Sequence, residues 1–463
     1  MARALAVGTV AAAFAAVRAA PAFANACTSN VVSGNWSVAG SWTGCGGVTP
    51  GAADSVTILN GHTITLDTSP TISSVTINNG GTLSADANNR TLTLNTTTTI
   101  PFTVAGTGTF NANNSTVVMN GNANLTVTSG AITFNNLTFQ PTVAASGKTY
   151  TFGGSAVTVN GTLNVAPTAA SALALTVNLG ATLTVGGATQ LAPTGSATAT
   201  MSTTASNFAL NTASLSNPAN TTFQANGSTV TITGTSGTLL TGGGTFTAGT
   251  SRFKYTGDGT ATLTSNNAFT FYDLELAPTI TATRTSTFGT SALAVNHSFT
   301  IDPTAATSQT LNVNLGAATT VTSQIKVAPT GSASANLSTT GSNFAVTAGT
   351  IDTESGGTLT ANGSLITLNG TSGTLFTNNG TFTQGTSKVL MAADAASTLT
   401  SGAITFNNLN IQPTITLARA QSFGTGQITV SGAYTVMPNA ASALALTLTQ
   451  GDNVSVTGSA TLS

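Results

Sequence analysis

Apolar and polar residues alternate with a period of two in many short segments of the chain. Clear examples are TLTLN at 91–95, STVTITG at 228–234, SFTID at 298–302 and LALTLTQ at 444–450. Successive side chains of a β-strand point to opposite sides, so this alternation predicts strands with one buried face. Turns rich in Gly, Asn and Ser separate the segments, and helical periodicity is absent beyond the N-terminus. The pattern predicts an all-β protein.

Two all-β architectures fit many short strands with frequent turns: a parallel β-helix (β-solenoid) and a string of sandwich domains. We favour the β-helix, because identical alternation in every coil would stack the apolar residues into one continuous, narrow core. Coils of about 20–25 residues spaced by ~4.8 Å predict a rod on the order of 90 Å long.

A long internal repeat organises the chain. GTF occurs at equal spacing, at Gly108, Gly244 and Gly380, and APTGSATATMSTTASNFAL at 192–210 returns as APTGSASANLSTTGSNFAV at 328–346. The repeat predicts units at 106–241 and 242–377, and an incomplete unit at 378–463. A solenoid that stops inside a unit would expose a sheet edge, so we expect the sequence to be a fragment.

Composition narrows the function. Only 5% of the residues are charged and the formal net charge is −1, so nothing predicts nucleic acid or anionic lipid as a partner. Beyond the N-terminus, no segment approaches the ~18 consecutive apolar residues of a transmembrane helix. Thr, Ser, Asn and Gly instead predict an uncharged surface that forms hydrogen bonds.

The N-terminus has the features of an export signal. Arg3 precedes an apolar segment at 4–17, and AFANA at 22–26 offers cleavage after Ala24 or after Ala26. We assign residues 1–26 to a signal peptide and expect a secreted or cell-surface protein. A lipid anchor on Cys27 is the alternative.

Cys27 and Cys45 are the only cysteines. In an exported protein, such a pair predicts one disulfide, worth about 3 kcal/mol for a loop of this size. No CxxC pair or other metal-ligand spacing is present, and no cofactor is predicted.

Residues 35–67 read NWSVAGSWTGCGGVTPGAADSVTILNGHTITLD. This segment resembles the start of the G8 domain of extracellular proteins, and the resemblance implies a G8-like capping module at 27–105. From the residues themselves we expect Trp36 and Trp42 to cover the first coil, His62 to lie in a turn, and Asp67 to end the following strand. A ligand site formed by these four residues is the alternative. The later GTFTAGTSRFKYTG resembles repeats of large bacterial adhesin-like solenoids, which implies a surface stalk.

Two pairs of acids have the spacing that places both side chains on one face of a strand: Asp273 with Glu275, and Asp352 with Glu354. Carboxylate pairs of this kind serve glycoside hydrolysis. The corresponding residues of the other units are neutral, however, so we predict a solvated face and no catalysis. Arg252, Lys254 and Tyr255 are interpreted as ordinary surface, with contact to a sugar acid as the alternative.

The sequence therefore favours a non-catalytic structural or adhesive protein that binds extracellular surfaces or polysaccharides. The alternatives are a carbohydrate-active β-helix enzyme and an ice-binding solenoid. The ice-binding alternative rests on threonines that point outward together: Thr229, Thr231, Thr233, and Thr279, Thr281, Thr283.

Overall fold

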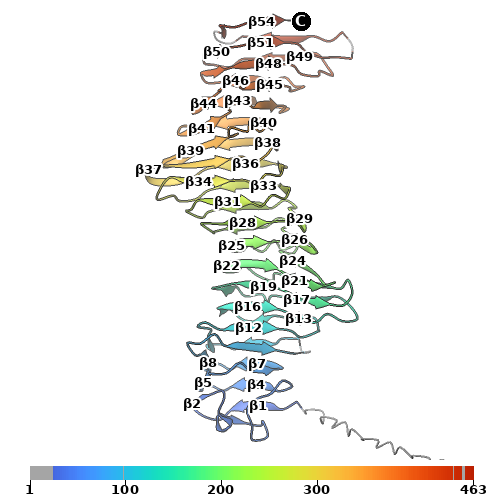
Figure 1. Ribbon diagram of the computed structural model, residues 1–463, viewed down its shortest axis with the longest axis vertical. Helices are drawn as coiled ribbons and strands as arrows, with labels where there is room; N and C mark the ends of the chain where they lie inside the picture. The colour runs from blue at the N-terminus through green and yellow to red at the C-terminus, as the bar shows by residue number, and fades with distance from the viewer. Residues whose placement is uncertain (1–23, 97–98, 442, 451–453, 463) are drawn as a thin grey trace, which may run out of the picture.

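The computed structural model is a straight rod in which the chain winds from one end to the other in sequence order (Figure 1). It describes residues 24–96, 99–441, 443–450 and 454–462; most of the predicted signal peptide therefore lies outside the described residues. The rod is a β-solenoid of about 17 turns. The predicted all-β fold and parallel β-helix are thus confirmed. At ~4.8 Å per turn its length is on the order of 80 Å.

Almost every strand pairs in parallel with the strand one turn away. The exception is β3 (Trp42–Thr43), which runs antiparallel beside β1 (Ala26–Ser29) at the N-terminal end, after the 3-10 helix η1 (Ala39–Ser41). Turn length varies, since the turn from Cys27 to Val56 contains much more chain than the next one, from Val56 to Val75. The range of coil lengths expected from the sequence is therefore too narrow, because turns differ in how much chain they place in corner loops.

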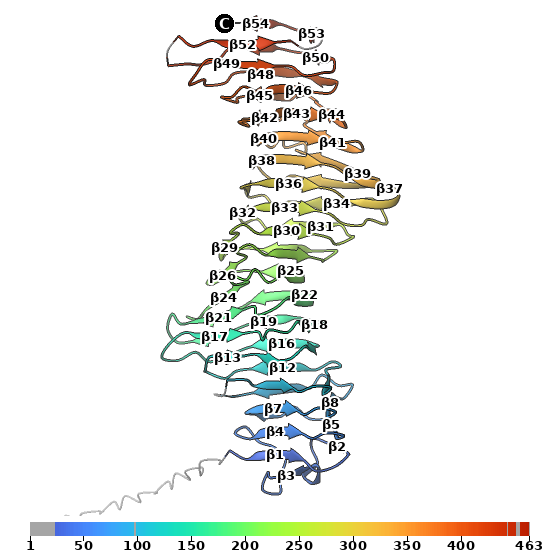
Figure 2. The ribbon, with the colours of Figure 1, turned by 180° about the vertical axis from the view of Figure 1, so that it is seen from behind.

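The strands form three ladders along the rod, seen from both sides in Figures 1 and 2. The first ladder includes β12 (Thr116–Met119), β16 (Asn136–Phe139), β19 (Leu163–Val165), β22 (Leu183–Leu191), β25 (Leu210–Ser216) and β28 (Thr238–Thr241). The second includes β27 (Thr229–Ile232), β30 (Arg252–Tyr255), β33 (Asp273–Leu276), β36 (Ser298–Ile301), β38 (Thr319–Val327) and β40 (Val346–Thr353). The third includes β17 (Lys148–Thr151), β21 (Ala174–Asn178), β24 (Thr198–Ser202), β26 (Thr221–Gln224) and β29 (Thr245–Thr247), and later β42 (Leu365–Leu368), β45 (Lys388–Met391), β48 (Asn408–Ile411) and β51 (Tyr434–Val436). The long strands β22, β25, β38 and β40 bend and contribute to two ladders each.

The sequence repeat does not match a whole number of turns. Five ladder steps separate β12 from β28. The chain then crosses two further faces, through β29, to reach β30, which is the repeat equivalent of β12. One repeat unit thus takes about five and two-thirds turns. As a result β12, β30 and β45, which are equivalent in sequence, lie in the first, second and third ladder respectively.

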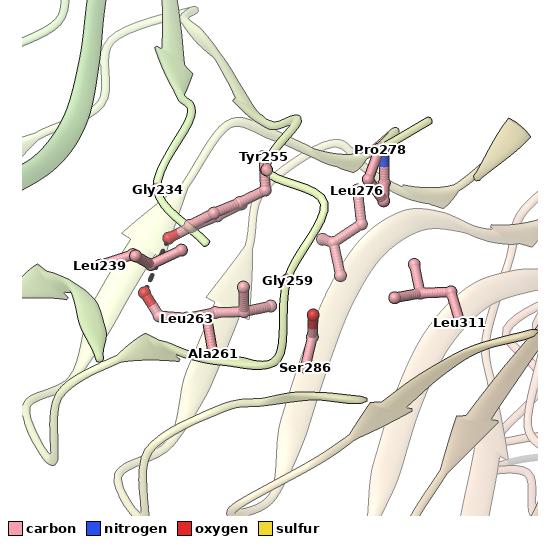
Figure 3. A pocket seen from close by; sticks show the side chains of 11 residues that line it. Gly234, Leu239, Tyr255, Gly259, Ala261, Leu263, Leu276, Pro278, Ser286 and Leu311 are labelled. Carbon is pink, nitrogen blue, oxygen red and sulfur yellow. Dashed lines mark hydrogen bonds between the residues drawn. The ribbon is translucent and has the colours of Figure 1, made fainter. Parts of the chain in front are cut away.

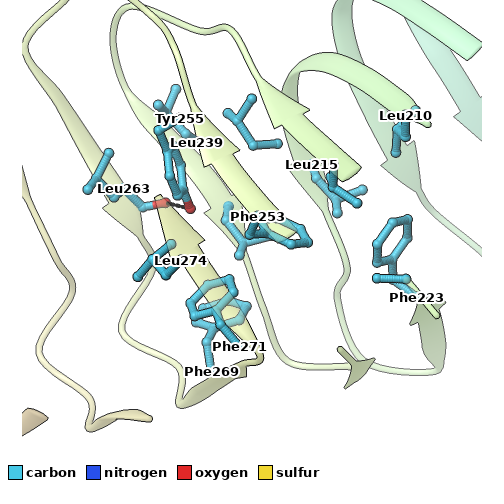
Figure 4. Close-up of a cluster of buried hydrophobic side chains, with 14 of the residues drawn as sticks. Leu210, Leu215, Phe223, Leu239, Phe253, Tyr255, Leu263, Phe269, Phe271 and Leu274 are labelled. Atoms are coloured by element: carbon cyan, nitrogen blue, oxygen red, sulfur yellow. Dashed lines mark hydrogen bonds between the residues drawn. The ribbon is translucent and has the colours of Figure 1, made fainter. Parts of the chain in front are cut away.

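Inward-facing apolar side chains stack into one core that runs through the rod. In the second ladder Val230, Phe253, Leu274 and Phe299 pair in successive turns, and each is at most 1% exposed. Figure 4 shows part of this core, with Phe253, Phe269 and Phe271 among its side chains. The ring centroids of Phe253 and Phe271 are 5.2 Å apart, within the range of favourable aromatic contact. Continuous burial is therefore achieved by stacking turns, as the alternation predicts.

The segment at 192–210, which is repeated at 328–346 and contains no charged residue, histidine or cysteine, forms a corner of the solenoid. Asn207 has a left-handed backbone (φ 57°), which Asn adopts more readily than most residues, and its Oδ1 accepts a hydrogen bond from Gly227 N of the next turn at 2.8 Å. Thr203 Oγ1 donates to Ala225 O at 2.7 Å. The second copy forms the same bonds between Asn343 and Gly363 and between Thr339 and Ala361. Because the segment is repeated almost unchanged, both units form the same corner.

Candidate functional site

A cluster of charged residues lies on the outer face of the second ladder, within unit 242–377. Arg252 pairs in register with Asp273, and Lys254 pairs in register with Glu275. His297 and Asp302 lie at the two ends of β36, one turn further along. Because turns stack in register, side chains that are far apart in sequence become neighbours on one surface.

Glu275 is the centre of this group. It is 5% exposed, and its carboxylate forms ion pairs with Arg252 and, at 3.0 Å, with Lys254. Asp352, which is 8% exposed, likewise pairs with Lys326 at 2.9 Å. The predicted solvated face is therefore wrong for these two acids, because long basic side chains of the preceding turns cover them.

Asp273 has a structural role that the other units reproduce with asparagine. Its Oδ1 accepts a hydrogen bond from Ser298 N at 3.1 Å, just as Asn136 accepts one from Thr162 N at 2.9 Å. Only here does the acceptor also bind a histidine, His297 Nδ1, at 2.7 Å. Burial opposes ionisation of Asp273, but the hydrogen bonds from Ser298 and His297 outweigh it and lower the pKa of the carboxyl group.

Asp302 is the acid that lacks a close partner. Its buried Oδ1 has no hydrogen-bond partner, although the side chain borders the surface. Burial, together with the negative charge of Glu275, raises the pKa of Asp302 to about 6. Asp273 and Asp302 therefore have pKa values shifted in opposite directions on one surface.

These groups line a surface groove of about 340 Å³. Beside it, the rings of Tyr272 and His297 are stacked, with centroids 5.1 Å apart and an interplanar angle of 16°. The His297 side chain is 52% exposed and the Arg252 side chain 53% exposed. The groove lining consists of Arg252, Asp273, Leu274, Glu275, His297, Ser298, Thr300 and Asp302.

Tyr255 is not part of this surface, contrary to its expected grouping with Arg252 and Lys254. It points into the core, where its hydroxyl donates to Leu263 O at 3.0 Å, and burial raises the pKa of the phenol. Figure 3 shows this ring at an internal cavity of about 10 Å³. Such a space holds at most about one water molecule, so it is no ligand site. The strand alternation explains the difference: residues 252 and 254 face outward, and 253 and 255 face inward.

The N-terminal residues singled out from the sequence lie close together. The predicted disulfide between Cys27 and Cys45 is present. Trp36 and Trp42 are both buried, in an edge-to-face contact of 4.8 Å, and Trp42 Nε1 donates to Trp36 O. Asp67 accepts a hydrogen bond from Ser37 N at 2.9 Å. Burial of both indoles leaves no aromatic surface for a ligand here.

His62, the fourth of these residues, lies in the turn before β5 (Thr63–Leu66), as expected. Its Nδ1 is 2.8 Å from Ser29 Oγ, and this hydroxyl in turn accepts a hydrogen bond from Leu59 N. The contact joins two neighbouring turns.

The structure also shows a surface feature that the sequence patterns did not reveal. Five threonines occupy one column of the third ladder in consecutive turns, and a shallow groove of about 400 Å³ lies over the last part of it. The equivalent column of the next unit contains two asparagines, Asn312 and Asn336. Only strand register, which sequence alternation does not supply, brings these threonines into line. The column consists of Thr149, Thr176, Thr200, Thr222 and Thr245.

Comparison with known proteins agrees with the resemblance at the N-terminal end. Residues 41–168 match the family model of the G8 domain. This region covers Trp42, Cys45 and the first turns of unit 106–241, and so runs past the expected module boundary at residue 105. Searches of the curated proteins and of the solved structures found no match. The molecule is a β-solenoid protein with a G8-matching region at its N-terminal end.

No group of three or more His, Cys, Asp or Glu side chains that could hold a metal ion occurs among the described residues. No helix formed by these residues is long and apolar enough to cross a membrane.

Proposed function

We propose that the protein is a secreted or cell-surface structural protein whose rod serves as a non-catalytic, adhesive stalk. The observation that carries this proposal is the stack of about 17 turns with one continuous core. Such a scaffold gives length and rigidity, and its turns depend mainly on their neighbours. The disulfide and the G8 match support an extracellular setting, since disulfides persist in oxidising compartments.

The surface supports adhesion through many weak, uncharged contacts. Several strands place threonine at their outward positions, as in β5 and in β9 (Thr91–Leu94), and charged residues are 5% of the chain. Hydrogen-bonding groups repeated along a rod can bind a repetitive partner, such as a polysaccharide, with gains from multivalency. In this proposal β3, Trp36 and Trp42 protect the first turn from edge-to-edge association.

An adhesion assay that compares the wild-type protein with a variant lacking four acidic residues tests the proposal. Asp273, Glu275, Asp352 and Glu354 are replaced by Asn together, and attachment of protein-coated beads to polysaccharide-coated surfaces is measured under flow. We expect attachment of the wild-type protein and little loss in the variant, because the contacts are spread over the rod. Polysaccharide cleavage by the wild-type protein that disappears in the variant would instead favour the carbohydrate-active enzyme.

One observation favours a second candidate function, ice binding. The column of five threonines presents hydroxyl groups at the turn spacing of ~4.8 Å, as a repetitive lattice would require. The threonine runs considered from the sequence do not form such an array: Thr229 and Thr231 share one strand, and Thr281 lies in a bend. An ice-recrystallisation assay with Thr200→Lys as the variant tests this candidate. No inhibition by the wild-type protein would remove it.

A further inference from the structure

The charged groove of unit 242–377 is an addition to the scaffold. The equivalent positions of unit 106–241 hold neutral residues in the same strand register: Thr116 replaces Arg252, Gly161 replaces His297, and Ala166 replaces Asp302. Those turns fold with the same pairing and an equally buried core. The fold therefore does not require the charged and aromatic side chains that line the groove.

The ion pairs restrict the charge of any ligand. Arg252 and Lys254 both pair with Glu275, whose side chain is 6% exposed. An anionic ligand that drew either cation away would leave a buried carboxylate less compensated, which is costly. The groups that remain for a ligand are the partly exposed Asp302 side chain and the Thr300 hydroxyl, while Ser298 Oγ, which already donates to Asp273, can only accept a hydrogen bond. These groups suit hydrogen bonds with uncharged hydroxyl groups.

The stacked rings of Tyr272 and His297 beside the groove add an apolar surface. His297 is fixed by its 2.7 Å bond to Asp273 and stacks on Tyr272, so the half-exposed imidazole is held in place before a ligand arrives. Ligand sites combine aromatic surfaces with a few polar groups that set orientation. A sugar ring offers both matching surfaces, since its C–H face packs on aromatic rings and its edge carries hydroxyl groups.

We propose that this groove binds an uncharged segment of a polysaccharide across β30, β33 and β36. The proposal rests on the proposed adhesive function and identifies the chemical class of its ligand. Three turns at ~4.8 Å span roughly 10–15 Å, enough for two or three sugar rings. The sugar packs on Tyr272 and His297, and Asp302 bonds to its hydroxyls.

Calorimetric titration with defined hexasaccharides tests the groove. The probes are cellohexaose, mannohexaose and xylohexaose, with hexagalacturonate as an anionic and chitosan hexamer as a cationic comparison. The variant Tyr272→Asn/His297→Gly/Asp302→Ala introduces the residues of unit 106–241, and Lys388→Thr changes an exposed charge in the next unit as the control. We expect at least one uncharged hexasaccharide to bind, the triple variant to bind it about tenfold or more weakly, and the control to bind like the wild type.

Three results would overturn the proposal: no binding of any uncharged probe, binding of a charged probe alone, or equal binding by the triple variant when its circular dichroism is unchanged. The bead assay described above separates this outcome from that of the proposed function. Equal hexasaccharide binding by wild type and triple variant, together with wild-type beads that still adhere, would refute the groove and leave the adhesive stalk intact. Wild-type protein that binds a hexasaccharide but shows no adhesion would refute the stalk and support the groove.

A different observation carries a second inference, at Asp54. This residue is 5% exposed, its Oδ1 accepts a hydrogen bond from Asn25 N at 2.8 Å, and its Oδ2 accepts one from Gly51 N at 2.8 Å. Asn25 O in turn accepts a bond from Ser55 N. Among the described residues, no cationic side chain forms an ion pair with Asp54.

We infer that export cleavage falls after Ala24, so that the mature chain begins at Asn25. Hydrolysis by water leaves a carboxylate on Ala24 and an ammonium group on Asn25, and this ammonium would lie beside the Asp54 carboxylate. Charge-assisted bonds of this kind are stronger than neutral ones. Cleavage after Ala26 would instead remove Asn25 and place the new terminus on Cys27, which is 1% exposed.

N-terminal sequencing and intact mass of the exported protein test this assignment. We expect a chain that starts at Asn25. A chain that starts at Cys27 would overturn the cleavage site alone, whereas an intracellular chain that keeps its leader would overturn export itself.

Discussion

Removal of one complete repeat unit is the sharpest test of the stalk. Deletion of residues 242–377 joins Thr241 to Asn378, so the strand β44 (Thr381–Thr383) follows β28 where β29 did. Phe382 then takes the place of Phe246, and Val389 the place of Phe253. The side chains nearest to Gly242, those of Asn267 and Phe269, leave with the deleted unit, so a larger residue at the junction meets no clash from them.

The deletion should shorten the rod and rotate the turns beyond the junction. About five and two-thirds turns at ~4.8 Å correspond to a loss of about 27 Å from a rod of roughly 80 Å. Turns beyond the junction should also be rotated by one-third of a revolution relative to the N-terminal turns. Small-angle scattering measures the shortening, and electron microscopy with a tag on each end measures length and rotation.

Surface attachment should fall gradually with this deletion, since reach and contact number decline together. The matched control deletes 242–383 instead, which removes β44 as well. The turn at that junction then lacks the strand of one face, so it cannot close and the turns beyond it should not stack. A compact or aggregated product from the full-unit deletion would refute nearest-neighbour stacking. Complete loss of a measurable polysaccharide-cleaving activity would refute the non-catalytic stalk.

Three other predictions concern stability. Replacing Cys27 and Cys45 with Ala should cost about 3 kcal/mol at the N-terminal turns while distant turns stay protected, and hydrogen exchange of β1 against β40 measures this. Uniform loss of protection along the rod would contradict it. Asp302→Asn should stabilise the protein at pH 7.5. The folded-state pKa of about 6 lies above the ordinary value near 3.9, so the wild type, but not the variant, should gain stability as pH falls from 7.5 to 5 in urea unfolding. An equal gain in both would show that Asp302 is not responsible. Phe253→Ala should cost about 3–5 kcal/mol, because its fully buried ring contacts Phe271, whereas the exposed Thr229→Ala should be nearly neutral in the same unfolding assay.

Alternation in the sequence was sufficient to predict strands, parallel stacking and a continuous core, because period two determines which side chain is buried. The same rule places Tyr255 on the opposite face of its strand from Arg252 and Lys254, so the burial of Tyr255 could have been predicted from the sequence. Burial of Glu275 could not be predicted in this way. It depends on which residues of the preceding turn lie beside it, and the register between turns is set by corner loops of variable length. For the same reason the column that includes Thr176 and Thr200 is visible only in the structure.

The mismatch between repeat length and turn length determines where equivalent surfaces point. Because β12, β30 and β45 belong to three different ladders, a patch repeated once per unit faces three azimuths, each one-third of a revolution from the next. A stalk built in this way presents a copy of such a patch to a flat substrate at any rotation about its long axis. It can therefore make contact without first rotating. The charged groove occurs in only one unit and has a single azimuth. Binding there would therefore fix the roll angle of the whole rod.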